Sequence, residues 1–164
     1  MEAGAYPLDL RPLAVSTLVG TTAKRLASQF KEKQVRLGWN LPADLPPVLA
    51  DEDRITQVLT NLLANALSYT PAGGIVTVSA AVSSADVQVS VRDTGVGIPA
   101  EHLAHIFDRF YRVDPSRSRA SGGGSGVGLT IARHLVEAHG GHLRAESQGE
   151  NKGSTFSFSL PVAK

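Results

Sequence analysis

The chain has 164 residues, enough for one compact domain with a buried hydrophobic core. Hydrophobic residues make up 42% of it and charged residues 19%, which excludes a disordered or fibrous chain. The formal net charge of +1 gives no overall attraction to nucleic acid or membrane, and the absence of cysteine excludes disulfides and thiolate metal sites. No apolar run approaches the roughly 20 residues of a spanning helix, and the N-terminus lacks a signal-peptide pattern.

The first part of the chain predicts an irregular segment, a helix and a strand. Residues 1–11 are punctuated by Pro and Gly and predict no regular structure. Residues 13–33 carry apolar side chains at helical spacing, and residues 35–39 alternate apolar and polar side chains as a half-buried strand does. The Pro-rich residues 41–47 are then expected to form a connector.

The clearest helix follows, because apolar residues recur between residues 55 and 67 at the spacing of one helical face. Asp51 is a suitable N-cap, and the acidic Glu52 and Asp53 suit the positive end of the helix dipole. Pro71 and the glycines that follow it are expected to end the helix.

The remaining elements predict a sheet that is covered by helices. Residues 114–124 are rich in Ser, Arg and Gly and are expected to be mobile. The grouping of strands and helices predicts an α+β fold, a two-layer α/β sandwich with a mixed, mostly antiparallel sheet and helices on one face. The expected elements are a hairpin of strands at 75–82 and 87–91, helices at 99–107 and 126–139, and strands at 143–147 and 155–160.

Asn61, Asn65 and Tyr69 follow one another at spacings of four, so they are expected in a row beside the apolar face of the clearest helix. Asparagine is a mediocre helix former, so two of them beside a core-facing stripe suggest a use. Either they make local hydrogen bonds on a half-exposed face, or a side-chain oxygen binds Mg²⁺, a hard cation that prefers oxygen. Taken alone, the pattern favours the first interpretation.

Two glycine-rich motifs come next. Asp93, Gly95 and Gly97 follow a strand directly, where an aspartate can accept a hydrogen bond from an exocyclic amine and glycines let the backbone approach a flat ring. A capped turn is the simpler interpretation. The glycines of residues 122–129 lead into a helix, whose N-terminus is a natural anion site, although such runs also serve as hinges. The run is not a P-loop, because the chain contains no Gly-Lys pair.

Arginines gather between the two glycine motifs. They are Arg109, Arg112, Arg117 and Arg119. Guanidinium groups match phosphate oxygens, so a basic lid over a triphosphate is one interpretation. A solvated basic loop is the other, and it is favoured for Arg119 and to a lesser degree for Arg109.

In order and spacing, these motifs resemble the boxes of the histidine kinase catalytic domain. Residues 53–71 resemble the N box, 93–98 the first glycine box, 106–112 the F box, 124–129 the second glycine box and 153–156 the final box. The resemblance spans about residues 50–160 with every box in sequence, which argues against a chance match. The resemblance implies the ATP-binding sandwich shared with gyrase-type topoisomerases, mismatch-repair ATPases and a heat-shock chaperone family. It also implies that residues 1–164 form a single catalytic domain with a flexible ATP lid, and that residues 1–10 are an irregular leader or linker remnant.

The resemblance implies a site for ATP and Mg²⁺, in which Asn61, Asn65 and Arg112 are expected to take part in catalysis. Asn65 is expected to ligate Mg²⁺, with Asn61 beside it near the phosphates. Asp93 is expected to bind the adenine amine. The other nucleotide contacts are expected from Tyr69 and Thr155 at the adenine, Gly95, Gly97 and Ile98 of the first glycine box, Tyr111 of the F box, Arg112 and Arg117 of the lid, and Gly126, Val127, Gly128 and Leu129 at the phosphates.

Two positions distinguish this chain from relatives. Ser68 stands where many family members carry Lys or Arg, so Arg112 or Arg117 is expected to supply more of the positive charge near the phosphates. ATPases of the superfamily carry Glu where this chain has Asn61. An asparagine cannot take a proton at neutral pH, so the site is expected to hold ATP without rapid hydrolysis.

The family's nucleophile is a histidine on an upstream dimerisation domain. None of the five histidines here is followed by an acidic residue, as the family's phosphoacceptor motif requires. His134, His139 and His142 lie near an expected helix end, where solvated or capping roles are predicted. We therefore expect the acceptor on an upstream dimerisation and histidine-phosphotransfer domain outside this chain.

The resemblance thus implies a sensor histidine kinase of a two-component system, which passes the γ-phosphate of Mg-ATP to that histidine and acts on a downstream response regulator. An anti-sigma-factor-type serine kinase shares the fold and is one alternative, and a nucleotide-sensing module without catalysis is another. The Arg/Ser/Gly-rich lid and the F box favour the histidine kinase. The isolated domain is expected to be a monomer and the full protein a homodimer, without a nucleic-acid partner, with this domain cytoplasmic and the parent in the bacterial inner membrane.

Overall fold

The computed structural model describes residues 7–108, 128–149 and 151–163. Its centre is a five-stranded sheet in the order β2-β4-β5-β7-β6. The β2–β4 pair is parallel and the other three pairs are antiparallel, which confirms the mixed, mostly antiparallel sheet. The strands are β2 (Arg36–Asn40), β4 (Ile75–Ser83), β5 (Asp86–Asp93), β6 (Leu143–Glu146) and β7 (Ser154–Pro161).

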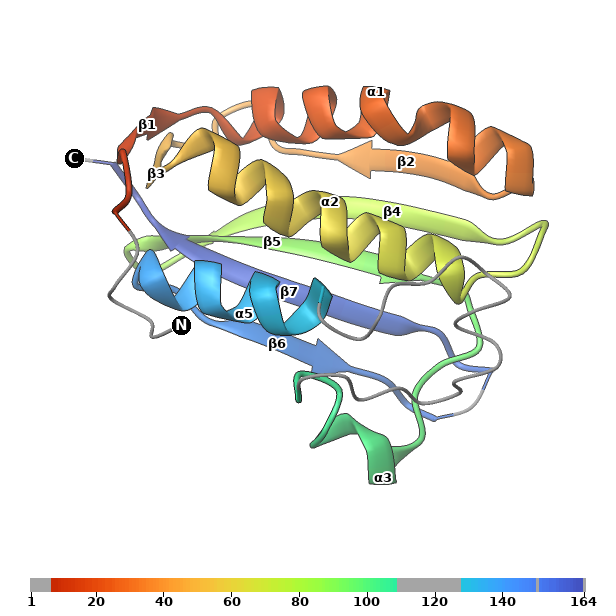
Figure 1. Ribbon diagram of the computed structural model, residues 1–164. Coiled ribbons are helices and arrows are strands. Elements are labelled where there is room, and N and C mark those ends of the chain that lie inside the picture. The colour runs from red at the N-terminus through yellow and green to blue at the C-terminus, as the bar shows by residue number, and fades with distance from the viewer. Residues whose placement is uncertain (1–6, 109–127, 150, 164) are drawn as a thin grey trace.

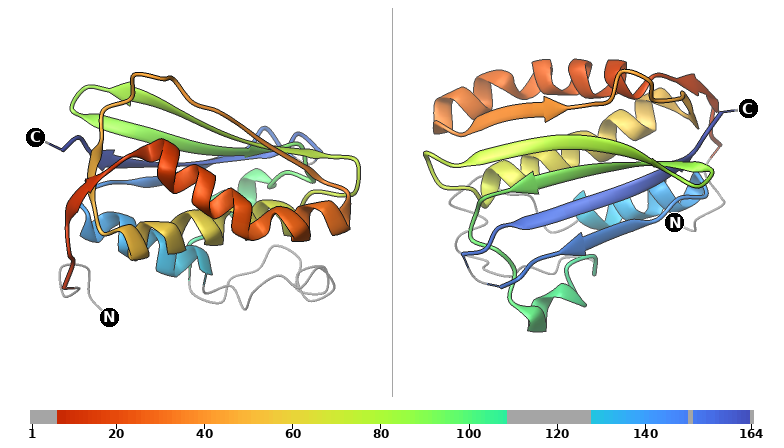
Figure 2. Two further views of the ribbon diagram at one scale, coloured as in Figure 1. Left: turned by 90° about the horizontal axis from the view of Figure 1, so that it is seen from above. Right: turned by 180° about the vertical axis from the view of Figure 1, so that it is seen from behind.

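Three helices pack on one face of this sheet. They are α1 (Val15–Lys33), α2 (Glu52–Ser68) and α5 (Gly128–Ala138), and in the drawn ribbon no described helix covers the opposite face (Figures 1 and 2). This arrangement confirms the two-layer sandwich with helices on one face.

Alternation along the central strands explains how the two layers hold together. Val87, Val89 and Val91 of β5 are buried, whereas the residues between them are partly exposed. Phe156 and Phe158 of β7 are buried in the same way and pair with Val91 and Val89. Burial of each such side chain contributes about 1.5–3 kcal/mol, so the helix-facing side of the sheet forms the core.

The ends of α2 are fixed by local hydrogen bonds. The Asp51 carboxylate accepts a 3.3 Å hydrogen bond from the backbone amide of Arg54, which confirms the expected N-cap. At the other end Tyr69 is the C-cap residue, and its amide donates to the carbonyl of Asn65 at 3.3 Å. The chain then turns at Pro71 towards β4.

A small second sheet was missed by the sequence patterns. β1 (Arg11–Leu13) pairs antiparallel with β3 (Val48–Ala50) and lies beside the start of α2. The helix expected at 99–107 is also shorter, because α3 (Ala100–Leu103) gives way to turns. Among the described residues, no helix has both the length and the apolar character needed to cross a membrane.

Candidate functional site

The N-box residues of the predicted site lie on α2 and at its C-terminal end. Asn61 and Asn65 lie one turn apart on α2, and Tyr69 follows at its C-terminal end. All three are partly exposed. The C-terminal half of α2, the end of β5 and the start of α5 lie at this same end of the molecule (Figure 1). Segments far apart in the sequence thus come together here.

The Asn61 side chain joins the N box to the beginning of α5. Its amide nitrogen donates a 3.0 Å hydrogen bond to the carbonyl of Gly128, the first described residue of that helix. With the amide nitrogen held in this way, the side-chain oxygen of Asn61 is free to accept a hydrogen bond. The contact brings the two predicted phosphate-side segments together.

Asn65 has the chemistry of a ligand for a hard cation. Its side chain is partly exposed and hydrogen-bonded to no other described residue. Within the described residues no group of three or more His, Asp or Glu side chains is placed to hold a metal ion. Mg²⁺ typically takes one or two protein oxygens and completes its shell with water and phosphate oxygens. The amide oxygen of Asn65 fits a Mg²⁺ ion that arrives with phosphates.

Asp93 ends β5 as a buried carboxylate, with only 3% of its surface exposed. One oxygen, Oδ1, accepts hydrogen bonds from the backbone amides of Gly95 at 2.9 Å and Ser154 at 3.2 Å, and Oδ2 accepts one from the Ser154 hydroxyl at 2.7 Å. Burial raises the pKa of Asp93, and the hydrogen bonds from Ser154 and Gly95 offset part of this effect. Because a carboxylate has about four acceptor positions, Asp93 can accept one further donor, such as an exocyclic amine.

The glycines after Asp93 allow close contacts within the protein itself. A side chain on Gly95 would collide with the carbonyl of Tyr69, and one on Gly97, where φ is 75°, would collide with the carbonyl of Gly149. The amide of Val96 donates a 3.1 Å hydrogen bond to the Tyr69 carbonyl. The first glycine box is therefore packed against the end of α2 on one side and the turn after β6 on the other.

The structure places Ser154, and not Thr155, against Asp93. In the register of β5 and β7, Ser154 pairs with Asp93 and Thr155 pairs with Arg92. Successive side chains of a strand point to opposite faces, so the Thr155 side chain lies on the face of the sheet away from the helices. This placement does not support the expected role of Thr155 beside the adenine, and sequence reasoning missed Ser154 because it did not fix the register of β7.

The start of α5 is also tied to the F box. The Thr130 hydroxyl donates a 2.8 Å hydrogen bond to the carbonyl of Phe107, and the Arg133 guanidinium lies 5.7 Å from the centre of the Phe107 ring. That ring in turn meets Phe156 edge-on at 6.2 Å. Leu129, between these contacts and Gly128, is partly buried against the core.

Several predicted site residues lie outside the described residues. This applies to Tyr111 of the F box, to the lid arginines and to the start of the second glycine box. Their roles stay predictions: Tyr111, Arg112, Arg117, Gly126 and Val127.

Ser68, the departure from the family pattern, is 8% exposed. Its carbonyl accepts a 3.1 Å hydrogen bond from the ammonium of Lys33, which also binds the carbonyl of Leu67 at 2.6 Å. A cation at the C-terminal end of α2 suits the negative end of the helix dipole. Sequence reasoning missed this role of Lys33, because the contact spans two helices.

His139 is a structural residue of the helix layer. It is 6% exposed, so of the two expected roles, solvated or capping, the solvated one does not apply to this histidine. Its Nδ1 lies 2.7 Å from the carbonyl of Leu135, and its Nε2 accepts a 3.0 Å hydrogen bond from the backbone amide of Asp51. The neutral ring therefore links the end of α5 to the start of α2.

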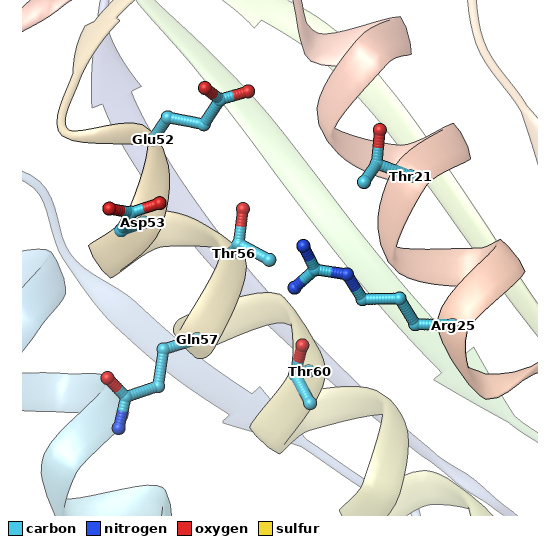
Figure 3. A pocket seen from close by; sticks show the side chains of 7 residues that line it. All are labelled: Thr21, Arg25, Glu52, Asp53, Thr56, Gln57 and Thr60. Atoms are coloured by element: carbon cyan, nitrogen blue, oxygen red, sulfur yellow. The ribbon is translucent and has the colours of Figure 1, made fainter.

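A polar groove of about 420 Å³ lies elsewhere, between α1 and the first half of α2 (Figure 3). None of the predicted nucleotide-binding residues lines it. Arg25 extends from α1 across the groove towards the threonines of α2. The lining residues are Thr21, Arg25, Glu52, Asp53, Thr56, Gln57 and Thr60.

Comparison with known proteins identifies relatives of this domain. Residues 50–164 match the family of histidine kinase-, DNA gyrase B-, and HSP90-like ATPases. The chain is 48% identical over 133 residues to the sensor histidine kinase WalK of Bacillus subtilis (strain 168). The aligned region covers 80% of this chain and 21% of WalK. The chain thus spans about a fifth of that relative's length.

Solved structures share the fold. Full-length ShkA in complex with AMPPNP superposes with a TM-score of 0.85 at 33% identity, over 98% of this chain and 32% of that one. A nucleotide-free form of the catalytic domain of the histidine kinase ThkA superposes with a TM-score of 0.81 at 26% identity, over 94% of this chain and 97% of that one. The family match and these similarities show that the chain belongs to the family of histidine kinase-, DNA gyrase B- and HSP90-like ATPases, and within it to the histidine kinase type.

Proposed function

We propose that this chain binds Mg-ATP and donates the γ-phosphate to a histidine on a dimerisation domain, as the catalytic domain of a sensor histidine kinase. The observation that carries the proposal is the contact between Asn61 and Gly128 beside Asn65, with the buried Asp93 at the same end of the sandwich. These residues offer an acceptor for the base and polar groups for the phosphates.

At the adenine side, Asp93 would accept a hydrogen bond from the exocyclic amine. Its carboxylate is held by Ser154 and Gly95 and keeps acceptor capacity. A purine with a carbonyl at that position would present lone pairs to the carboxylate and be rejected. Tyr69, at the end of α2, would pack against the base, and Gly95, Gly97 and Ile98 would form the backbone wall of the adenine pocket.

At the phosphate side, Asn65 would hold Mg²⁺, with Asn61 close by, and the backbone at Gly128 and Leu129 would face the phosphates at the N-terminus of α5. Bound there, Mg²⁺ would neutralise the phosphate charge. We further propose that Arg112, Arg117, Tyr111, Gly126 and Val127 complete the phosphate contacts.

In the proposed transfer, a nitrogen of the acceptor imidazole attacks the γ-phosphorus. A nitrogen–phosphorus bond forms as the bond between that phosphorus and the β,γ-bridging oxygen breaks, and ADP leaves. The attacking imidazole nitrogen carries a lone pair and no proton, so the kinase domain need not deprotonate it, and the proton on the other ring nitrogen is released to solvent after the transfer. Asn61, with its nitrogen bonded to Gly128, is unsuited to activate water, which supports storage of ATP over hydrolysis.

Relatives support this proposal. ShkA has been seen with AMPPNP, and the ThkA histidine kinase, 24% identical to this chain with a TM-score of 0.78, has been seen in complex with the response regulator TrrA. We propose that the full protein likewise uses ATP and acts on a response regulator. Residues 1–164 would then be a single catalytic domain of a homodimeric sensor kinase, cytoplasmic and attached to a parent in the bacterial inner membrane.

A transfer assay tests the proposal. The chain is incubated with a helical dimerisation domain that carries a phosphoacceptor histidine and with ATP radiolabelled at the γ-phosphate. The expected product is label on the acceptor domain that acid removes and alkali does not, because phosphohistidine is acid-labile. Acid-stable label on serine would indicate a serine kinase, and nucleotide binding without any transfer would indicate a sensing module; either result contradicts the proposal. Acceptor with its histidine replaced by alanine is the control.

A further inference from the structure

The hydroxyl of Ser147, the first residue after β6, contacts four backbone groups. It accepts hydrogen bonds from the amides of Ile98 at 2.9 Å and Gly149 at 3.3 Å, and it lies 2.7 Å from the carbonyl of Gly153 and 3.4 Å from that of Gly149. A hydroxyl has one hydrogen to donate and two lone pairs with which to accept. The short contact to Gly153 therefore uses the donor, and all the capacity of the hydroxyl is filled.

The groups that Ser147 joins lie on both sides of Asp93. Ile98 closes the first glycine box, which starts at Asp93, and its side chain is 8% exposed in the core. Gly153 directly precedes Ser154, whose hydroxyl and amide hold the Asp93 carboxylate. One side chain thus links the two segments that orient Asp93.

Direct contacts between these segments leave little room for adjustment. The amide of Gly153 donates to the carbonyl of Gly95 at 3.2 Å, and the amide of Asn151 donates to the carbonyl of Val96 at 2.6 Å. Gly97 packs so closely on the Gly149 carbonyl that a side chain would not fit. The backbone on both sides of Asp93 is therefore closely packed, and the Ser147 hydroxyl adds a further link between the two segments.

We propose that Ser147 is a positioning residue for nucleotide recognition: its hydroxyl fixes the first glycine box and the Gly153–Ser154 backbone so that Asp93 is presented to the base. The inference rests on the proposed binding of adenine nucleotides, and it adds a residue that acts through Ile98 and Gly153. Without the hydroxyl, the Ile98 amide loses its acceptor, and one of the hydrogen bonds that join the glycine box to the turn after β6 is lost.

The test compares three variants. Ser147→Ala removes the hydroxyl, and Ser147→Thr keeps a hydroxyl at this partly exposed position. Ser157→Ala is the matched control: Ser157 also uses its hydroxyl in the same sheet, 2.9 Å from that of Ser90, but it faces away from the helices. All three variants change a serine in or next to β6 and β7, and neither Ser147 nor Ser157 is itself proposed to contact the ligand.

Two quantities are measured, the dissociation constants for ATP and ADP by calorimetry and the hydrogen exchange of the Ile98 amide by NMR without nucleotide. Ser147→Ala is expected to raise the dissociation constants for ATP and ADP by the same factor, about tenfold, because both nucleotides carry the adenine. It is also expected to speed exchange at Ile98. Ser147→Thr and Ser157→Ala are expected to stay within about twofold of the native affinity, even if Ser157→Ala lowers the melting temperature as much as Ser147→Ala does.

Native affinity in Ser147→Ala, or an equal loss in Ser157→Ala, would overturn the proposal. If Ser147→Ala does not fold, Ser147→Cys keeps the size of the side chain but supplies a weak acceptor, and native affinity in that variant overturns the proposal equally. A native chain that binds no adenine nucleotide would contradict the proposed function instead. Failure of the Ser147 role and failure of the function are therefore distinguishable.

Discussion

The hydroxyl of Ser154 donates a 2.7 Å hydrogen bond to Asp93, and the backbone amide of the same serine holds the other carboxylate oxygen at 3.2 Å. The pair brings the start of β7 against the end of β5. It holds a buried carboxylate whose pKa burial has raised. The ionised form is thus costly for the free protein and useful to a ligand that donates a hydrogen bond.

Asp93→Asn is expected to weaken ATP and ADP binding by about 10- to 100-fold, since a hydrogen bond to a charged group contributes about 1.5–3 kcal/mol. The free variant is expected to be at least as stable as the native chain, because a buried charge is removed while the shape is kept. Calorimetric titration and thermal unfolding measure the two effects. A variant that binds ATP as tightly as the native chain contradicts the assignment of Asp93.

The raised pKa of Asp93 predicts two opposite responses to pH. Its folded pKa lies above the unfolded value, so its contribution to stability without nucleotide is fully present below the unfolded pKa and is lost as pH rises through the folded one. Nucleotide binding needs the ionised form and is expected to weaken as pH falls. Unfolding and ATP titrations from about pH 7 down to about pH 4, near the ordinary pKa of an aspartate, measure both trends. Asp93→Asn should show neither, and a variant that keeps both would show that another group titrates.

Ser154→Ala and Thr155→Ala separate the two faces of β7. Ser154→Ala removes a hydroxyl bonded to Asp93 and is expected to weaken the binding of adenine nucleotides about 5- to 10-fold. Thr155→Ala is expected to change their affinity less than twofold. Side-by-side titration with ADP is the measurement. If the losses are reversed, the register of β7 does not describe the bound state.

The link from His139 to Asp51 is expected to stabilise the helix layer without affecting recognition of the base. His139→Leu leaves the Asp51 amide without its acceptor, which is expected to lower the free energy of unfolding by about 1–3 kcal/mol. His139→Gln can restore an acceptor, and His142→Leu, at an exposed position, is the control. Urea denaturation measures the effect; equal stability of the two leucine variants would show that the bond contributes nothing.

Arg112→Ala is expected to weaken ATP binding about tenfold, and ADP less, because guanidinium pairs with phosphate oxygens. Ser68→Ala is expected to leave affinity nearly unchanged, since Ser68 is 8% exposed and cannot supply charge. The ratio of ATP to ADP dissociation constants in the two variants is the measurement. Equal losses of affinity in the two variants would rule out that Arg112 supplies the positive charge that other family members carry at the position of Ser68.

Much of the fold could be predicted from local patterns. The periodicity of residues 55–67, the Asp51 cap and Pro71 define α2, and alternation defines the hairpin of β4 and β5. β1 and β3 were not predicted, because three-residue strands carry no periodic signal. Their pairing also joins Leu13 to Val48, which are separated in the chain by α1 and β2. The helix expected at 99–107 ends early at Leu103, and the Phe107 that follows is held by Phe156 and by Thr130 of α5.

The site was predictable where one box carries the chemistry and not where two boxes meet. Asp93 was predicted because its motif resembles the first glycine box of the family, although a capped turn is the simpler interpretation of the motif alone. Ser154 and Ser147 did not, because their roles depend on the register of β7 and on contacts with residues 61 and 49 positions away in the chain. The glycines were predicted to admit a ligand, and the structure adds that Gly95 and Gly97 admit the protein's own backbone.

The fate of the γ-phosphate tests the central claim most directly. The chain is incubated with γ-labelled ATP, first alone and then with the acceptor domain, and free phosphate and labelled protein are quantified together over time. We predict almost no free phosphate from the chain alone and, after the acceptor is added, label that accumulates on its histidine as acid-labile phosphate. Rapid release of free phosphate without the acceptor, or no label on the histidine with it, would contradict the account.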